Sequence, residues 1–387
     1  MEKAKGIMKK YTMVLVLILV ALLFTWQTDG KLLLPANVNN LIAQNAYVFV
    51  LATGMLLCIL TGGNIDLSVG SVVCFVGAVG GTLMVTYKVN IFVAIIAMIA
   101  VGLIIGAWQG FWIAYMRIPP FIVTLAGMLI FRGLSNVILN GLTLSPMPQN
   151  YLNLFNTYIP DFIAHNDDFN VTCMVIGVLA CIIFIVIALR NRKIKQSKNY
   201  EVEPVTSMII RSVIICAAVL YFAFKLAQHK GIPTVFIWVL AIIVIYAYIT
   251  SKTTNGRYYY AVGGNEKATK LSGINTNKVY FKAYMNMAFL AAIAGMITIA
   301  RLNSANPTAG TNYEMDAIGS CFIGGASAYG GTGTVTGVIV GALLMGVINL
   351  GMNIMGVDAN YQKVVKGSVL LAAVIFDVVS KKESKEN

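Results

Sequence analysis

The chain has 387 residues, of which 58% are hydrophobic and 11% are charged, whereas soluble domains contain about 25% charged residues. A water-soluble fold cannot bury that much apolar surface, so the composition predicts an all-α, polytopic membrane protein. The formal net charge of +13 is compatible with nucleic-acid binding. The basic residues, however, gather mainly in short loops between apolar segments, which is the positive-inside pattern of membrane proteins. We therefore expect membrane lipid as a partner and no nucleic acid.

Apolar segments long enough to span a bilayer recur along the whole chain, which predicts a single transmembrane domain, residues 1–387. The first apolar run, 11–27, has no small-residue cleavage site after it, so we expect an uncleaved helix rather than a signal peptide. Segment 314–329 is short and rich in glycine, so a full crossing and a re-entrant segment both stay open, giving about 10–12 transmembrane helices. The predicted spans are 11–27, 42–61, 68–87, 91–115, 120–140, 171–189, 208–226, 232–250, 281–300, 314–329, 334–354 and 361–379.

Charge in the loops predicts that both termini are cytoplasmic. If the chain starts inside, the basic stretch 190–195, the loop after the eighth span and the tail 381–385 all fall on the inside. The longest outer connector, 141–170, contains no Lys or Arg. The two patterns agree on one orientation.

The run TGGNIDLSVGS at 61–71 interrupts two apolar stretches with glycines and a carboxylate, Asp66. Irregular or charged backbone at membrane depth persists only where protein or water surrounds it, so this break predicts a transport pathway. Residues 323–342 repeat the pattern of a Gly-Gly pair, a polar insert and an apolar helix, which indicates glycine-broken helices in each half. The alternative is that small residues merely let helices pack closely.

A polar, basic loop at about 251–280 separates the eighth and ninth spans. Within it Ala268, Leu271 and Ile274 recur at three-residue intervals, so Asn265 to Ser272 is expected to form a short amphipathic helix. Docking into a groove on a partner protein and lying on an anionic membrane surface are both consistent with such a helix. The residues alone leave these two interpretations open.

Catalytic and metal chemistry is not indicated. The cysteines form no C-x-x-C pair, and clustered His, Cys or carboxylate residues are missing from the sequence, so we expect no metal, no cofactor, no catalytic residues and no enzyme activity. The chain also lacks a G-x-x-x-x-G-K-[ST] phosphate loop, so energy for transport comes from a partner or from an ion gradient. An ion-coupled carrier would need intramembrane carboxylates. The candidates are Asp66, Glu314, Asp316 and Asp377.

Four sequence blocks resemble the monosaccharide-type permeases of bacterial ABC importers, and the likeness extends from about Leu41 to Asp377. The blocks are GGNIDLSVGS at 62–71, GAWQGFWIAY at 106–115, PPFIVTLAGMLIFRG at 119–133 and GRYYYAVGGNEKATKLSGI at 256–274. An extra basic loop and helix pair at about 190–230 makes the chain most similar to the longer xylose and multiple-sugar permeases.

The resemblance implies a permease in the inner membrane of a bacterium, with a separate ABC ATPase, an extracytoplasmic sugar-binding protein and a second permease copy. Xylose is the leading candidate substrate, and other pentoses and hexoses are alternatives. An ion-coupled secondary sugar transporter is the alternative function. Residues expected to contact the ATPase are Gly263, Gly264, Asn265, Ala268, Leu271, Ser272 and Gly273.

Residues expected at the substrate pathway are Asn64, Asp66, Ser68, Thr124 and Arg132. Arg132 lies in the middle of the fifth predicted span, where an unpaired charge costs about 2.5–3.5 kcal/mol. It is expected either to pair with Asp66 or Glu314 as a structural strut or to line the pathway. Trp108, Phe111 and Tyr115 are more typical of an interfacial aromatic belt than of a sugar-stacking site.

Overall fold

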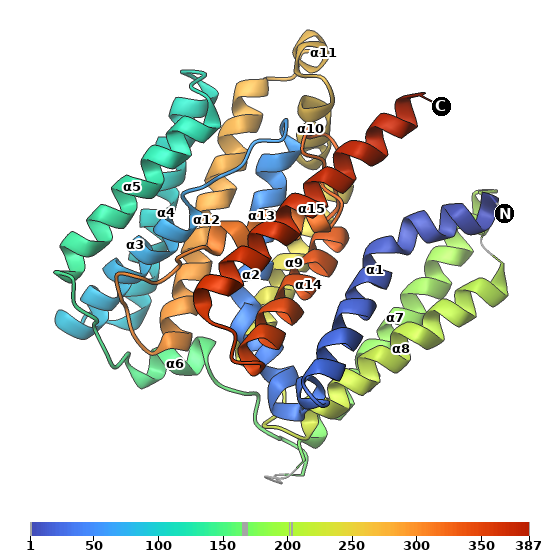
Figure 1. Ribbon diagram of the computed structural model, residues 1–387, viewed down its shortest axis with the longest axis horizontal. Coiled ribbons are helices and arrows are strands. Elements are labelled where there is room, and N and C mark those ends of the chain that lie inside the picture. Colours follow the sequence, from blue (N-terminus) through green and yellow to red (C-terminus); the bar gives the residue numbers. More distant parts are fainter. Residues whose placement is uncertain (1, 165–168, 201, 203, 387) are drawn as a thin grey trace.

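The computed structural model describes residues 2–164, 169–200, 202 and 204–386, without the side chains of 2–12, 376 and 379–386. Nearly all of the regular structure in these ranges is helical (Figure 1). The β-pairing in the same ranges consists of the isolated bridges Leu144–Ala305 and Tyr158–Pro233. The helices are α1 (Glu2–Gln27), α2 (Pro35–Leu60), α3 (Val69–Gly81), α4 (Ile91–Ala114), α5 (Pro120–Leu139), α6 (Gln149–Phe155), α7 (Val171–Ser197), α8 (Val205–Ala227), α9 (Thr234–Lys252), α10 (Thr254–Gly264), α11 (Glu266–Leu271), α12 (Thr276–Leu302), α13 (Tyr313–Ile323), α14 (Val335–Ile354) and α15 (Ala359–Glu386).

The predicted all-α polytopic class is confirmed. Within the described ranges, nine helices are long and apolar enough to cross a membrane, among them α3 with the π-helical turn Thr82–Thr86 that continues it. They coincide with predicted spans, although α2 begins earlier, at Pro35, because proline is tolerated in the first turn of a helix. The predicted polar loop 251–280 contains two helices, α10 and α11, of which the sequence indicated only the second.

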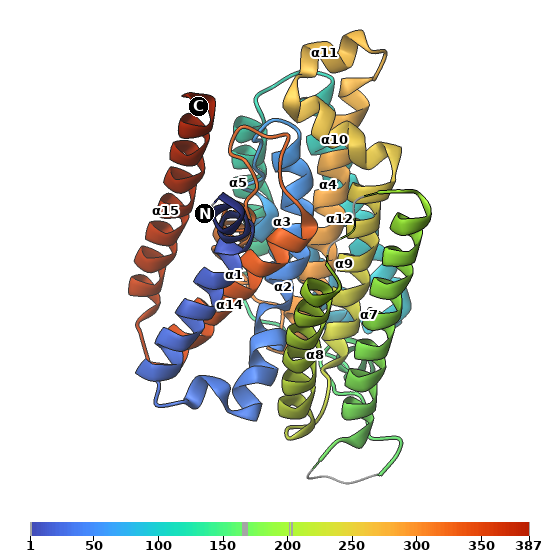
Figure 2. The same cartoon turned by 90° about the vertical axis from the view of Figure 1, so that its right-hand side faces the viewer.

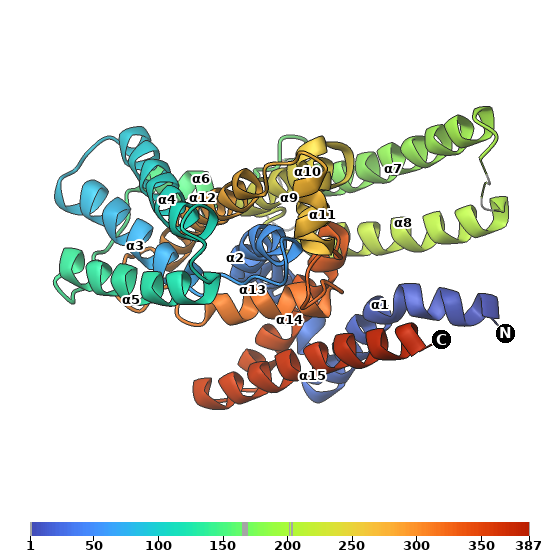
Figure 3. The ribbon, with the colours of Figure 1, turned by 90° about the horizontal axis from the view of Figure 1, so that it is seen from above.

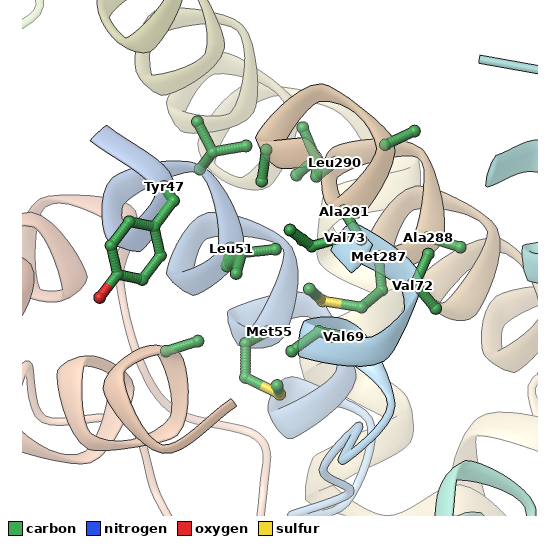
Figure 4. Packing of buried hydrophobic residues seen from close by; sticks show 14 of the residues in the cluster. Tyr47, Leu51, Met55, Val69, Val72, Val73, Met287, Ala288, Leu290 and Ala291 are labelled. Atoms are coloured by element: carbon green, nitrogen blue, oxygen red, sulfur yellow. The ribbon is translucent and has the colours of Figure 1, made fainter. Parts of the chain in front are cut away.

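Helix α12 forms the centre of the bundle and packs against α2, α3 and α4. Figure 4 shows the apolar side chains of α2, such as Leu51 and Met55, meeting Met287 and Leu290 of α12. On the other side, the α4 glycines 102, 106 and 110 lie directly against α12, where an added Cβ would crowd Ala292, Met285 or Phe281. Small residues at four-residue spacing let two helices approach closely within a membrane.

Two crossings are broken. After α2, residues 61–68 run without regular structure before α3 begins; after α12, residues 303–312 do the same before α13. The breaks meet at Gly70 and Gly310, where a Cβ on either residue would overlap the carbonyl oxygen of the other. From this contact the helices diverge, α3 packing with α4, α5 and α12, and α13 with α2, α14 and α15.

The predicted segment 314–329 is shorter as a helix than expected. Helix α13 has 11 residues, whereas a crossing needs about 20. It ends at Ile323, and residues 324–334 form a glycine-rich loop before α14. Of the two alternatives left open for this segment, the short helix is more compatible with a re-entrant segment than with a full crossing. The Gly324-Gly325 pair ends the helix, and Gly325 has a φ of +85° that favours glycine.

Helices α7 and α8 form an antiparallel pair at one edge of the bundle, seen from above in Figure 3. The basic stretch 190–195, expected as a loop within the extra segment at about 190–230, is helical, because α7 continues to Ser197. Figures 1 and 2 show the C-terminal end of α15 toward the α11 end of the bundle and the N-terminal end of α1 near half its height. The cytoplasmic placement of both termini stays a prediction.

A buried ion pair joins α13 to α15. Asp316, which is 1% exposed, lies 2.9 Å from the Lys366 Nζ and also accepts a hydrogen bond from the hydroxyl of Tyr47 on α2. The Tyr47 ring stacks on Tyr313 with centroids 3.5 Å apart. Three helices that are far apart in the sequence are therefore held together by one carboxylate.

We predict that Lys366→Met destabilises the protein by about 3–5 kcal/mol, because it leaves Asp316 as an uncompensated buried charge. The double variant Asp316→Asn/Lys366→Met should recover most of the loss, since the amide oxygen still accepts from Tyr47. The measurement is the unfolding midpoint in detergent. Equal midpoints for Lys366→Met and the wild type would show that the pair does not stabilise the fold.

Candidate functional site

Asp66 holds the start of α3 inside the protein. The carboxylate is 1% exposed, and its Oδ1 accepts hydrogen bonds from the Ser68 N–H at 2.8 Å and the Ser68 hydroxyl at 2.6 Å. An acidic group just before a helix satisfies free N–H groups and interacts favourably with the positive end of the helix dipole. Asp66 therefore supports the broken crossing from within.

The polar contacts of Ser68 extend to the neighbouring helices. Gln109 of α4 donates to the Ser68 hydroxyl at 2.6 Å, and Gly127 of α5 lies against both side chains. Thr124, one turn earlier on α5, is fully buried and donates to the Pro120 carbonyl. The structure thus brings Asp66 and Ser68 together and places Thr124 on the α5 face that packs on them.

Arg132 of α5 binds backbone carbonyls of the second break, residues 303–312. Its Nη1 donates to the carbonyl oxygens of Pro307 at 3.0 Å and Ala309 at 2.7 Å. These backbone carbonyls are its hydrogen-bond partners, and the charge of Glu314, one of the two expected carboxylates, also interacts with Arg132. The guanidinium therefore supports the backbone of the second break, which is compatible with a strut and with a place on the pathway wall.

A strip of polar side chains follows the second break at the depth of Arg132, and its members are half-buried or exposed on the outer surface of the chain. We call it the polar strip, and its residues are Asn306, Thr308, Thr311, Asn312 and Glu314. Asn64, in the first break, is also half-buried. Lipid cannot satisfy such groups at membrane depth. Water or another protein surface has to cover this strip.

The two glycine-rich segments singled out in the sequence lie side by side. A Cβ at Gly63 would overlap the Ala328 carbonyl oxygen, and the Gly331 N–H donates to the Leu60 carbonyl at 3.0 Å. Gly263, near the end of α10, lies against the same Leu60 carbonyl and the Gly331 nitrogen. We call this meeting of three segments the glycine junction; its residues are Leu60, Gly63, Gly263, Ala328 and Gly331.

Helix α11 protrudes from the end of the bundle (Figure 2). It covers Glu266–Leu271, and the Asn265 side chain caps it by accepting from the Ala268 N–H at 2.9 Å. The expected short helix is therefore present. Leu271 is 89% exposed, and a Cβ at Gly264 would meet open space.

The other residues expected to contact the ATPase occupy two kinds of position. Asn265, Ala268, Ser272 and Gly273 are exposed beside Leu271. Gly263 is half-buried in the glycine junction.

Arg117 ties α11 to the turn between α4 and α5. Its guanidinium lies 2.7 Å from the Glu266 carboxylate, and the Tyr280 hydroxyl donates to the same carboxylate at 3.1 Å. Burial alone would raise the pKa of Glu266, but the hydrogen bond and charge of Arg117 lower it below its usual value. The carboxylate stays ionised, and α11 is held in place by an ion pair.

Sequence reasoning missed two functional candidates, Gln109 and Arg117, and one contact, that of Gly263. Gln109 is a polar residue inside an apolar helix, a signal that was available. Arg117 follows the fourth span, and its partner lies 149 positions later along the chain, at Glu266. The contact of Gly263 with the glycine loops had no local signal beyond the Gly-Gly pair itself.

Three kinds of comparison bear on the identity of the chain. A family model described as "Branched-chain amino acid transport system / permease component" matches residues 37–374. The chain is 36% identical over 374 residues to the xylose transport system permease protein of Escherichia coli (strain K12), covering 97% of this chain and 93% of the relative. No solved structure matches.

Two further relatives are similar over almost their whole length. The xylose transport system permease protein of Haemophilus influenzae (strain ATCC 51907 / DSM 11121 / KW20 / Rd) is 36% identical over 384 residues, 99% of this chain and 100% of the relative. The ribose import permease protein of Escherichia coli (strain K12) is 35% identical over 372 residues, 96% of this chain and 94% of the relative.

The helical bundle, its two broken crossings and the protruding α11 define a multi-pass membrane transport subunit. The chain belongs to the family of transport-system permease components, in its branch of monosaccharide-type ABC importers. Such permeases reside in the bacterial inner membrane and work with a separate ATPase and an extracytoplasmic binding protein. They are transport channels rather than enzymes.

We predict that Asp66→Leu reduces transport far more than membrane insertion, because it leaves the buried Ser68 N–H without its acceptor, a loss worth about 1–3 kcal/mol. Asp66→Asn should keep most of the activity, since the amide oxygen replaces Oδ1. Uptake normalised to membrane abundance is the measurement. Full activity of Asp66→Leu would rule out an essential role for this group.

Proposed function

We propose that this permease imports a monosaccharide, with xylose as the leading candidate and other pentoses and hexoses as alternatives. The names of the xylose and ribose permeases that resemble it support the substrate class. An extracytoplasmic binding protein delivers the sugar, and ATP hydrolysis on a cytoplasmic ATPase drives its release inside.

The polar strip is the observation that carries the proposed pathway. Polar groups at membrane depth need water or protein around them, and the strip is uncovered in a single chain. A second copy of the permease facing the strip would enclose a water-filled passage whose walls offer hydroxyl and amide groups. Such groups suit the hydroxyls of a neutral sugar.

Within this pathway the five expected residues take different roles. Arg132 and Asn64 are half-buried beside the breaks and lie closest to the passage. Asp66, Ser68 and Thr124 are buried behind it. We assign Asp66, Ser68 and Thr124 to the positioning of α3. We assign Arg132 and Asn64 to the wall of the passage.

An ion-coupled carrier is the less favoured function. Of the four candidate carboxylates, Asp66 binds Ser68, Asp316 pairs with Lys366, and Asp377 accepts the Ala328 N–H. The fourth, Glu314, belongs to the polar strip, and its charge interacts with Arg132. In the described part of the chain, no group of three or more His, Cys, Asp or Glu residues could hold a metal ion. Three of the four carboxylates thus serve structural contacts, which supports ATP as the energy source.

The exposed tip formed by Gly264, Ala268, Leu271, Ser272 and Gly273 supports docking of the ATPase. Leu271 offers an apolar anchor, and the small residues beside it permit close approach of a groove. The alternative, in which α11 rests on anionic lipid, would leave ATPase binding independent of these residues.

We predict that vesicles loaded with ATP, containing this permease, its ATPase and its binding protein, accumulate labelled xylose when an uncoupler is present. An ion-driven carrier draws on about 2.3 kcal/mol per charge per 100 mV and would stop. Uptake should fail when the catalytic residue of the ATPase is mutated. Uncoupler-sensitive uptake that persists without the ATPase would contradict the proposal, and a panel of other labelled sugars identifies the substrate.

We predict that Leu271→Asp and Gly264→Trp each abolish co-purification of the ATPase and sugar uptake, while the permease still accumulates in the membrane. Both sites face open space, so neither change disturbs the fold. Leu271→Met keeps an apolar anchor and serves as the control that should retain binding. Normal ATPase binding by the first two variants would favour the membrane-surface interpretation.

A further inference from the structure

Helix α10, which leads into the docking helix α11, meets both glycine-rich segments of the glycine junction through the backbone of Gly263. A Cβ on Gly263 would overlap the Leu60 carbonyl oxygen and lie 2.5 Å from the Gly331 nitrogen. Leu60 ends α2 directly before the first break, and Gly331 belongs to the loop that follows α13. One glycine of α10 therefore contacts the chain at both glycine-rich segments.

Helix α10 is coupled rigidly to α11. A single residue, Asn265, separates them, and the Thr269 hydroxyl of α11 donates back to the Ala261 carbonyl of α10 at 2.8 Å. On the other side, the Tyr260 hydroxyl of α10 donates to the Gly333 carbonyl at 2.9 Å. A displacement of α11 is thus passed to α10 and then to the loop 324–334.

The two glycine-rich segments of the glycine junction are attached directly to α3 and α13. Residues 61–68 connect Leu60 to α3, whose first turn lies against Gly310 in the second break. Loop 324–334 connects α13 to α14, and its Ala328 N–H is held by Asp377 of α15. Movement of the junction therefore reaches α3 and α13, which border the polar strip.

We propose that the glycine junction is the connection through which movement of the docked ATPase changes the pathway, with Gly263 as its central positioning residue. This inference rests on the proposed function of α11 as the ATPase docking site. Contacts between backbones transmit displacement because no rotatable side chain lies between them to absorb it.

The test compares Gly263→Ala with Gly367→Ala in the complete complex with ATPase and binding protein. Gly367 is exposed on α15 and an added Cβ meets nothing within 4 Å there. Gly263→Ala should keep the ATPase bound but lower the sugar molecules transported per ATP hydrolysed by about tenfold or more, a typical size for coupling between sites. Gly367→Ala should match the wild type in both measurements.

A second variant avoids the risk that Gly263→Ala fails to fold. Tyr260→Phe adds no atoms and removes the hydroxyl that binds Gly333, so the same ratio should fall about two- to tenfold, the range of one hydrogen bond. Tyr248→Phe, on a ring that is 63% exposed on α9, is the control.

The proposal would be overturned if Gly263→Ala and Tyr260→Phe both transported as many sugar molecules per ATP hydrolysed as the wild type. Loss of the bound ATPase in Gly263→Ala would also overturn it, because Gly263 would then belong to the docking surface only. If α11 is not the docking site, Leu271→Asp retains the ATPase. This result separates a failure of the docking proposal from a failure of the coupling proposal.

Discussion

Backbone amide and carbonyl groups at membrane depth have no water to bind, so a broken helix has to satisfy them from within the protein. Two charged side chains do this here, one for each kind of group. The Asp66 carboxylate accepts from the backbone N–H at the start of α3. The Arg132 guanidinium donates to the Pro307 and Ala309 carbonyls of the second break. The rest of the pathway depends on these two breaks being stable.

This division explains why the sequence locates the two charged residues but not their hydrogen-bond partners. A charge in an apolar span is visible without a structure, because it costs free energy wherever it is unpaired. Its partner is not visible when that partner is backbone, since every residue carries the same N–H and C=O groups. For Arg132 the sequence therefore indicated carboxylates as partners, and the charge of Glu314 does interact with it, but the Pro307 and Ala309 carbonyls that its guanidinium binds were not indicated.

The predicted spans agree with the helices because a continuous apolar window is a local property of the sequence. The end of α13 and the existence of α10 were missed because they depend on distant segments. Loop 324–334 is held by Leu60 and Asp377, and α10 packs on the same loop through Gly263. Glycine was the available local signal, and glycine alone does not reveal which segment approaches it.

The bundle combines two kinds of packing with different mechanical consequences. Around α12, large apolar side chains from α2 and α3 interlock (Figure 4), and such cores resist deformation because they are close-packed. At the glycine junction, backbones meet directly and are joined by hydrogen bonds such as that from the Gly331 N–H to the Leu60 carbonyl, so a displacement of one segment is passed to the next. A force applied at α11 therefore moves the glycine loops before it disturbs the core, and α3 and α13 are the helices attached to those loops.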